Sequence, residues 1–282
     1  MNKIIRRIQK ILFKEQWVLL VENKNTGRTC QVEPPSKEFI WADPFIVKHE
    51  NRTYVFIEQQ RRNQNGTLGY IEIFEDGSHS GFIEILKAGY HLSYPCVFQP
   101  GVNGDTNYYM IPETHENNRI SLYRSDGFPD RWSHYKTLIK GISAVDATIL
   151  KHGDLWWLFT SVNGADSNFN NSLNIYYSNA FDSEEWTPHP LNPVSRKYSA
   201  SRMAGSFLRQ DDALIRPAQS CRKEYGEHLV FYEVNELTTT TYRETERSRL
   251  LPEKHLSAVC THTFSESTDY IVRDIKTRKF FI

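Results

Sequence analysis

The 282-residue sequence has only four cysteines, and no two of them are close enough to form a C-x-x-C pair: Cys30, Cys96, Cys221 and Cys260. This spacing argues against the usual zinc-binding motifs. We therefore expect reduced, buried thiols, and a protein that resides in the cytosol or faces it.

Net charge is also lacking, because 34 basic residues balance 34 acidic ones. No basic field is present to recruit nucleic acid. The sequence contains no glycine-rich phosphate loop that opens a helix, and no D-x-D pair at the end of an expected strand. We accordingly predict no nucleic-acid partner, no cofactor and no obligatory metal ion.

No apolar run is long enough to cross a bilayer, but the first thirteen residues, MNKIIRRIQKILF, are amphipathic. Isoleucine and leucine recur at helical spacing, and lysine and arginine lie between them. We predict a short basic helix over residues 1–15. It either lies on an anionic membrane surface, at the inner face of the membrane, or packs on the domain as a cap.

The main positive feature is a repeated outline of strand, polar turn and strand. It is clearest in WADPFIVKHENRTYVFIEQ (41–59) and returns at 93–113, 145–161 and 204–220, with a weaker echo at 261–264. A period of about fifty residues is typical of propeller blades. We predict an all-β fold, a single five-bladed β-propeller over residues 16–282. The strand WVLLVE, which begins at Trp17, and YIVRDIK near the C-terminus should complete the last blade together.

In a propeller, equivalent positions of the innermost strands face one central space. The repeat therefore predicts a shared site at the mouths of these strands and at the ends of the second strands. Several charged groups are expected there, although buried carboxylates are costly unless paired. The inner-strand candidates are Asp43, Tyr94, Asp146, Arg202 or Gly205, and His262, and the second-strand candidates are Glu58, Glu113, Arg216 and Gln219.

Structural roles remain open for these residues at this point. Asp43 could cap a turn before Pro44, and Glu113 could form an ion pair with Arg119 or Arg124. Arg216 could simply neutralise the acids across the central space, and Tyr94 could be a core residue.

Two motifs in this series, WADPF and VDAT, look like the inner-strand aspartate motifs of glycoside hydrolase family 43 propellers. The longer series WADPF, HLSYP, YMIPE, VDAT, WWLF, RPAQ, YG and HTF resembles the N-terminal propeller of glucosamine inositolphosphorylceramide transferase and its free-standing bacterial counterparts. The resemblance runs from Trp17 to the C-terminus. It implies a carbohydrate enzyme of surface polysaccharide or glycolipid synthesis.

In the hydrolase comparison, Asp43 matches the general base or nucleophile. Asp146 matches the aspartate that tunes the pKa and orients the catalytic groups. Blade four supplies Arg216-Pro217-Ala218-Gln219 where the proton-donating acid should stand. Glycoside hydrolysis ordinarily needs that acid. Glu113 could replace it, so hydrolase or phosphorylase activity remains an alternative, together with a noncatalytic glycan-binding propeller.

An arginine fits transfer from a nucleotide-sugar donor, whose phosphate leaving group needs a cation more than a proton. We therefore favour a glycosyltransferase with a glycan or glycolipid acceptor. Asp43 or Glu113 would be the base, and Asp146 would orient the sugar. The remaining candidates would bind substrate: Glu58, His91, Tyr94, Arg202, Arg216, Gln219 and His262.

Overall fold

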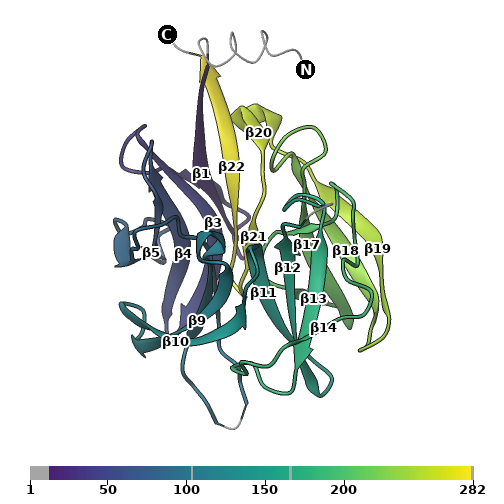
Figure 1. The fold of residues 1–282 in the computed structure, drawn as a ribbon. Helices are drawn as coiled ribbons and strands as arrows, with labels where there is room; N and C mark the ends of the chain where they lie inside the picture. Colours follow the sequence, from purple (N-terminus) through teal and green to yellow (C-terminus); the bar gives the residue numbers. More distant parts are fainter. Residues whose placement is uncertain (1–12, 103, 165–166, 281–282) are drawn as a thin grey trace.

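The computed structural model describes residues 13–102, 104–164 and 167–280. Five antiparallel sheets surround a central axis (Figure 1), so the predicted five-bladed β-propeller is confirmed. The described residues form two short 3₁₀ helices, His115–Asn117 and Lys254–Leu256. No helix in these ranges is long and apolar enough to cross a bilayer.

Each of the first three blades consists of four consecutive strands, ordered from the axis outward. Blade 1 contains β3 (Phe39–His49), β4 (Arg52–Arg61), β5 (Gly66–Ile73) and β6 (Ile83–Leu86). Blade 2 contains β7 (Ser93–Phe98), β8 (Tyr109–Glu113), β9 (Arg119–Gly127) and β10 (Arg131–Lys140). Blade 3 contains β11 (Ala144–His152), β12 (Leu155–Val162), β13 (Leu173–Ser178) and β14 (Thr187–Pro188).

The innermost strand of each of the last two blades is divided into two short pieces. In blade 4, β15 (Arg202–Met203) and β16 (Leu208–Gln210) both pair with β17 (Ala213–Ser220), which is followed by β18 (His228–Leu237) and β19 (Tyr242–Leu250). In blade 5, β20 (Ala258–Cys260) and β21 (Phe264–Glu266) both pair with β22 (Tyr270–Phe280), and β1 (Phe13–Asn23) and β2 (Thr29–Val32) complete the sheet.

Strands from the two ends of the chain close the ring. β1 and β22 pair along their whole length, from Phe13 opposite Phe280 to Asn23 opposite Tyr270. This confirms that the first and last strands share one blade, which removes an open sheet edge. Because β1 already begins at Phe13, residues 13–15 are strand rather than the end of the expected helix. The rest of that helix prediction, residues 1–12, lies outside the described residues.

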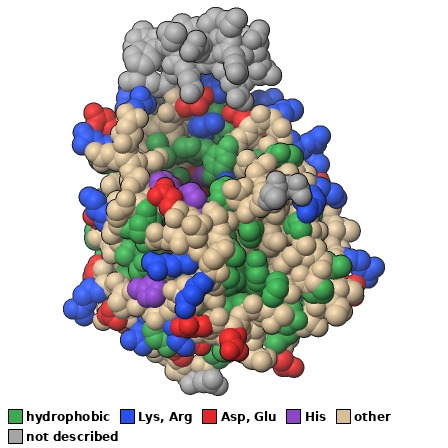
Figure 2. Space-filling model, in the orientation of Figure 1, with side chains coloured by type: hydrophobic (Ala, Val, Ile, Leu, Met, Phe, Trp, Pro, Cys, Tyr) green, Lys and Arg blue, Asp and Glu red, His purple; other side chains and the backbone are tan. Residues whose placement is uncertain are grey.

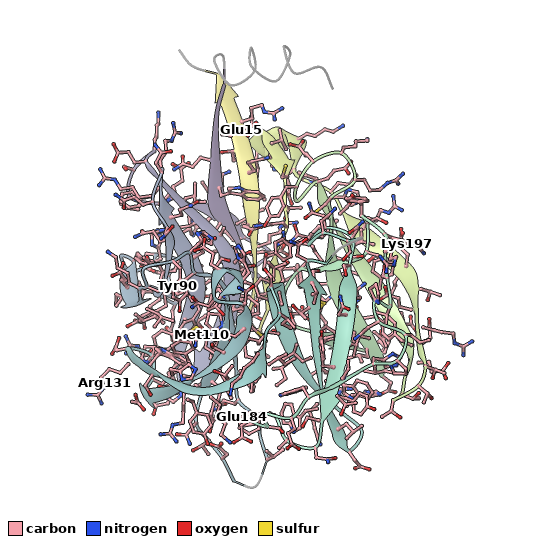
Figure 3. All side chains as sticks on the ribbon, viewed as in Figure 1. Glu15, Tyr90, Met110, Arg131, Glu184 and Lys197 are labelled. Atoms are coloured by element: carbon pink, nitrogen blue, oxygen red, sulfur yellow. The ribbon has the colours of Figure 1, made fainter. Side chains whose placement is uncertain are left out.

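Aromatic side chains fill much of the space between blades. Met110 lies among densely packed side chains in Figure 3 and is fully buried. The indole N–H of Trp132 donates to the carbonyl oxygen of Pro129 at 2.7 Å, and that of Trp186 donates to Ser183 at 2.8 Å. Both tryptophans thus fix the same kind of turn before an outermost strand, as expected for equivalent positions in consecutive blades.

All four cysteines are free thiols, as predicted. Cys96, Cys221 and Cys260 are buried, and Cys30 is half-buried. Burial raises the pKa of Cys96 to about 12, so this thiol stays protonated and chemically inert.

Candidate active site

The innermost strands deviate from regular β geometry at matching positions. Asp43, Tyr94 and Asp146 each lie in a bulge with positive φ, at 54°, 47° and 56°, and Gly205 has φ 118°. Residues other than glycine rarely adopt this left-handed backbone conformation, and a bulge redirects the side chain of the residue that it contains. Four blades therefore repeat one backbone feature at the residues that the sequence repeat aligns.

Gly205 is the blade-four member of this set, and its lack of a side chain is required. A Cβ atom there would lie 1.9 Å from the carbonyl oxygen of Phe264. Its N–H donates instead to the hydroxyl of Tyr94 at 2.8 Å. Close approach of two backbones thus explains the glycine.

Tyr94 is part of the scaffold and does not face a ligand, which corrects the prediction that it lines a sugar site. Its side chain is 1% exposed, and its ring packs edge-on against Phe45. Its hydroxyl lies 2.8 Å from the hydroxyl of Thr148 and accepts from Gly205. The bonds join blades 2, 3 and 4 across the axis, leaving no ring face free for a pyranose.

Asp43 is held at the axis by donors from two other blades. The hydroxyl of Thr263 donates to Oδ1 at 2.8 Å, and the N–H of Tyr94 donates to Oδ2 at 3.2 Å. Burial raises the pKa of Asp43, His262 lowers it, and the charge of Asp274 raises it, so that it lies above its ordinary value of 3.8. The result is an oriented carboxylate with increased basicity.

Asp274, on β22, organises the backbone around Asp43. One carboxylate oxygen accepts the N–H groups of His262 and Thr263 at 2.9 and 3.0 Å, and the other accepts the N–H of Asp43 at 2.9 Å. The side chain is fully buried. This single carboxylate thereby links the inner strands of blades 5 and 1, although no motif in the sequence marks it.

His262 lies between the two aspartates. Its Nδ1 is 2.6 Å from an Asp274 oxygen, but the two atoms are not aligned for a hydrogen bond. Its Nε2 is 3.5 Å from an Asp43 oxygen. The ring stacks on Trp17 with centroids 4.3 Å apart. Burial lowers the pKa of His262, but the charges of Asp274 and Asp43 raise it by more than burial lowers it. The pKa of His262 therefore lies above its ordinary value of 6.5. The imidazole is therefore biased toward its cationic form.

Asp146 and Glu113 share Arg202. The guanidinium donates to both oxygens of Asp146, at 2.6 and 2.9 Å, and lies 4.0 Å from Glu113. Glu113 also contacts His115 Nδ1 at 2.9 Å, and this hydrogen bond raises the pKa of His115. The predicted alternative, in which Glu113 pairs with Arg119 or Arg124, is replaced by pairing with Arg202 and His115.

Glu58, which lies next to His91, provides a further carboxyl group beside the axis. The N–H of Gly66 donates to His91 Nδ1 at 3.0 Å, so a neutral His91 carries its proton on Nε2, which is 3.4 Å from Glu58 Oε1. Burial, followed by the charges of Asp43 and Glu113, raises the pKa of Glu58 well above 4.5. A Cβ atom on Gly66 would lie 2.6 Å from Oε1 of Glu58, so the glycine makes room for this carboxyl group.

Tyr225 lies beside Arg202 and His262, and it is a further site residue that no sequence pattern predicted. Its side chain is 41% exposed, although burial of its hydroxyl end raises the pKa and the charges of Arg202, Asp43 and Asp146 act on it. The ring lies 5.0 Å from the Arg202 guanidinium and 5.2 Å from the His262 ring. Its exposed face is thus available to pack on a sugar. Figure 2 shows a hollow whose wall carries histidine, acidic and hydrophobic side chains.

Arg216 does not join these residues, which corrects the prediction that it binds a donor phosphate. It is fully buried and donates twice to Glu244 on β19, at 2.7 Å each. Its other contacts are with Ala200, Met203 and Tyr232. Within the part of the chain that the structure describes, no hydrogen bond or ion pair connects it to the axial acids. Gln219 is opposite Arg202 in the β15–β17 register, and its amide contacts Met203 and Cys221.

We call the residues that do converge the axial cluster: Asp43, Glu58, Glu113, Asp146, Arg202, His262 and Asp274. Three of them, Asp43, His262 and Asp274, could each place a ligand atom within 4.8 Å of the others. The carboxylates of Asp43 and Asp274 already accept N–H and O–H groups. Independence from a metal ion remains a prediction, which activity after chelator treatment would test.

Glu58→Gln should increase thermal stability more at high pH than at low pH. The raised pKa means that folded Glu58 holds its proton above pH 4.5, where the unfolded carboxyl loses it, so rising pH destabilises the native state through this group. The neutral amide removes that effect. Melting temperatures of both proteins from about pH 4 to about pH 8 should diverge as pH rises. Glu84→Gln, at an exposed acid on β6, is the control, and a constant offset for Glu58→Gln would contradict the prediction.

Residues 25–260 match the family model described as glucosamine inositolphosphorylceramide transferase 1, N-terminal. The chain belongs to this family. The resemblance predicted from the motifs is confirmed. The family match covers the axial cluster residues Asp43, Glu58, Glu113, Asp146 and Arg202, while His262 and Asp274 lie beyond its last residue.

Curated relatives of this family are plant proteins. The chain is 31% identical over 210 residues to glucosamine inositolphosphorylceramide transferase 1 of Oryza sativa subsp. japonica, and 31% identical to the Arabidopsis thaliana protein of the same name. The aligned region is 72% of this chain but 27% of the rice protein. The chain thus spans about a quarter of the length of these relatives.

Solved structures share the fold at low sequence identity. A family 117 glycoside hydrolase of Zobellia galactanivorans superposes with a TM-score of 0.60 at 10% identity, covering 93% of this chain and 90% of that one. An exo-β-1,3-galactanase of Phanerochaete chrysosporium gives a TM-score of 0.60 at 10% identity, covering 81% of this chain and 58% of that one. The chain therefore shares the fold of these two enzymes.

Proposed function

We propose that this protein transfers a sugar from an activated donor to a hydroxyl group of a glycan or glycolipid acceptor, with Asp43 as the general base. The orientation and raised pKa of Asp43 support this proposal most directly. A base with a pKa closer to neutrality removes a hydroxyl proton more effectively than an ordinary carboxylate. In this mechanism Asp43 takes the acceptor proton as the new glycosidic bond forms.

The other axial residues bind and orient the two substrates in this proposal. Asp146 and Glu113 accept sugar hydroxyls, while Arg202 fixes both carboxylates. Arg202 and His262 are the cations closest to the exposed ring of Tyr225, where they would stabilise charge on a departing nucleotide phosphate. Arg202 and His262, which the sequence suggested as assisting groups, thus act at the phosphate without Arg216.

The plant relatives support a glycolipid-related transferase, because they carry that name. Transfer by this chain is a proposal, since it spans 27% of the rice protein's length. A nucleotide-sugar donor, a location in the cytoplasm and contact with the inner face of the membrane through residues 1–13 are part of the same proposal. Residues 1–12 lie outside the described residues.

Hydrolysis is the second candidate, and Glu58 is the observation that favours it. A carboxyl group that keeps its proton above the ordinary range can donate it to a glycosidic oxygen. In this alternative Glu58 supplies the acid that blade four lacks. The sequence had suggested Glu113 for this role. Asp43 would then activate water or attack the sugar.

A ligand screen separates these functions. We expect one nucleotide sugar from a panel to raise the melting temperature. At a ligand concentration of about a hundred times its dissociation constant, it should stabilise the folded protein by about 2.7 kcal/mol. Release of free nucleotide in the presence of an acceptor glycan should accompany it. A shift with free oligosaccharides only, together with their cleavage, would replace transfer by hydrolysis. A shift with oligosaccharides and no turnover would indicate a noncatalytic glycan-binding propeller.

A further inference from the structure

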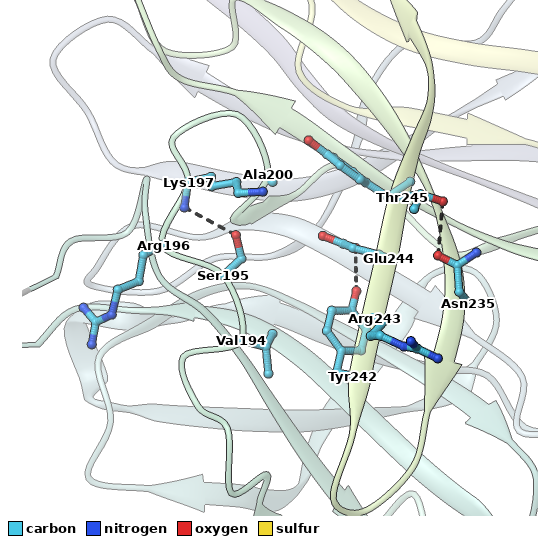
Figure 4. A pocket seen from close by; sticks show the side chains of 11 residues that line it. Val194, Ser195, Arg196, Lys197, Ala200, Asn235, Tyr242, Arg243, Glu244 and Thr245 are labelled. Atoms are coloured by element: carbon cyan, nitrogen blue, oxygen red, sulfur yellow. Dashed lines mark hydrogen bonds between the residues drawn. The ribbon is translucent and has the colours of Figure 1, made fainter.

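A groove of about 730 Å³ lies on the outer side of blade 4, apart from the axial cluster. Its walls are residues 194–200, which connect blades 3 and 4, and strands β18 and β19 (Figure 4). Figure 3 places Lys197 at this side of the molecule, across from Tyr90. We call it the outer groove; its lining includes Ser195, Lys197, Tyr232, Asn235, Glu244 and Thr245.

Glu244 is a carboxylate whose orientation within this groove is fixed by neighbouring hydrogen-bond donors. The buried guanidinium of Arg216 donates two hydrogen bonds to it, and the hydroxyl of Tyr242 donates a third at 2.5 Å. The side chain of Glu244 is 11% exposed. A carboxylate can accept about four hydrogen bonds, so capacity for one ligand hydroxyl remains.

Neighbouring groups have the chemistry that sugars require. The Thr245 hydroxyl donates to Asn235 Oδ1 at 3.1 Å (Figure 4), and among the described residues the Asn235 amide nitrogen has no hydrogen-bond partner. The Tyr232 ring is held by the Arg216 guanidinium, 5.1 Å from its centroid. Fixed carboxylates and amides bind sugar hydroxyls, while Tyr232, which is 8% exposed, forms part of the groove wall.

The rim of the outer groove carries positive charge. Lys197 and Arg243 line it, and its one acidic lining residue, Glu244, is neutralised by Arg216. Arg243 pairs with Glu236 at 2.7 Å, whereas no acid within the described residues pairs with Lys197. This balance favours a ligand with a carboxylate or another anionic group.

We propose that the outer groove binds an acidic glycan chain, which supplies a second point of attachment for the acceptor. The proposal rests on the proposed carbohydrate-directed function and names the acceptor class. The groove is joined to the axial cluster through β15, where Met203 contacts Arg216 at 3.7 Å and the adjacent Arg202 binds Asp146. A chain held in the groove lies on the blade that also carries Arg202.

Calorimetric titration with a matched pair of oligosaccharides tests the proposal. Hyaluronan tetrasaccharide carries carboxylates, and chitotetraose is its neutral counterpart. We expect the acidic probe to bind the wild-type protein about tenfold more tightly, and Lys197→Ala to remove this preference. Asn235→Ala should weaken both probes by about tenfold through loss of a hydrogen bond. Arg247 is on β19 but does not line the groove, so Arg247→Ala should bind both probes as the wild type does.

Equal affinity of the wild type, Lys197→Ala and Asn235→Ala for the acidic probe would overturn the proposal. So would the absence of binding to either probe at about 10 mM. The outcome is separable from the proposed catalysis, because Asp43→Asn should bind hyaluronan tetrasaccharide with unchanged affinity. Binding in the groove without sugar transfer by the wild type would reject the transferase alone, and transfer with unaffected groove variants would reject the groove alone.

Discussion

Asp274→Ala is expected to lower the free energy of unfolding by about 3–9 kcal/mol, a large fraction of the stability of a domain. The alanine leaves the N–H groups of Asp43, His262 and Thr263 without their acceptor in a buried region. Each unsatisfied group costs about 1–3 kcal/mol. Denaturant titration followed by circular dichroism measures the effect, and the melting temperature should fall by roughly 10 °C.

Asp274→Asn is the matched control for that experiment. Its side-chain oxygen can still accept the N–H groups of His262 and Thr263, although its amide nitrogen can no longer accept from Asp43. We expect a loss of stability between those of the wild type and Asp274→Ala. An alanine variant that unfolds at the wild-type denaturant concentration would show that Asp274 does not hold the inner strands together.

Asp43→Asn is expected to reduce sugar turnover by about 10³-fold, the range found when a general base is removed. The amide has nearly the shape of the carboxylate but cannot take a proton from the acceptor. The asparagine oxygen can still accept from the Tyr94 N–H, its amide nitrogen can donate to the Thr263 hydroxyl, and the repulsion between Asp43 and Asp274 disappears. The melting temperature should therefore remain within a few degrees of the wild-type value, while the rate measured with the donor found by the ligand screen falls.

Asp212→Asn provides the control for turnover. Asp212 lies in an exposed turn of blade 4 with φ 67°, a conformation that asparagine also tolerates. This variant should retain wild-type turnover and stability. Wild-type turnover in Asp43→Asn would remove Asp43 from the mechanism and leave Glu113 as the candidate base.

The fold was predictable because its signal is repeated. The outline from Trp41 to Gln59 recurs in the other blades, and matching turns precede Trp132 and Trp186. The pairing of β1 with β22 was predictable as well, because a ring of sheets is closed only when its two ends share a blade. The start of β1 at Phe13 was not, since apolar residues just before it fit a helix and a strand equally well.

The axial site was predictable only where the repeat reaches. The alignment of Asp43, Asp146 and Gly205 marks the residues that have positive φ, although no local pattern announces a bulge there. Asp274 was missed because it stands in the middle of β22, in a sequence that reads as an ordinary strand. Tyr225 was missed because it lies in the loop between β17 and β18, outside the strand residues that recur from blade to blade.

The sequence by itself determined the number of blades, the way the ring closes, the family and which inner-strand positions are equivalent, because all of these follow from residues that recur along the chain. Only the tertiary structure decided which charges meet. Arg216 and Gln219 are close in sequence, yet Arg216 is bound to Glu244 on the outer strand and Gln219 is opposite Arg202. The partner of a buried charge is set by contacts between strands that are distant in the chain, and hydrophobic alternation records burial without recording the partner.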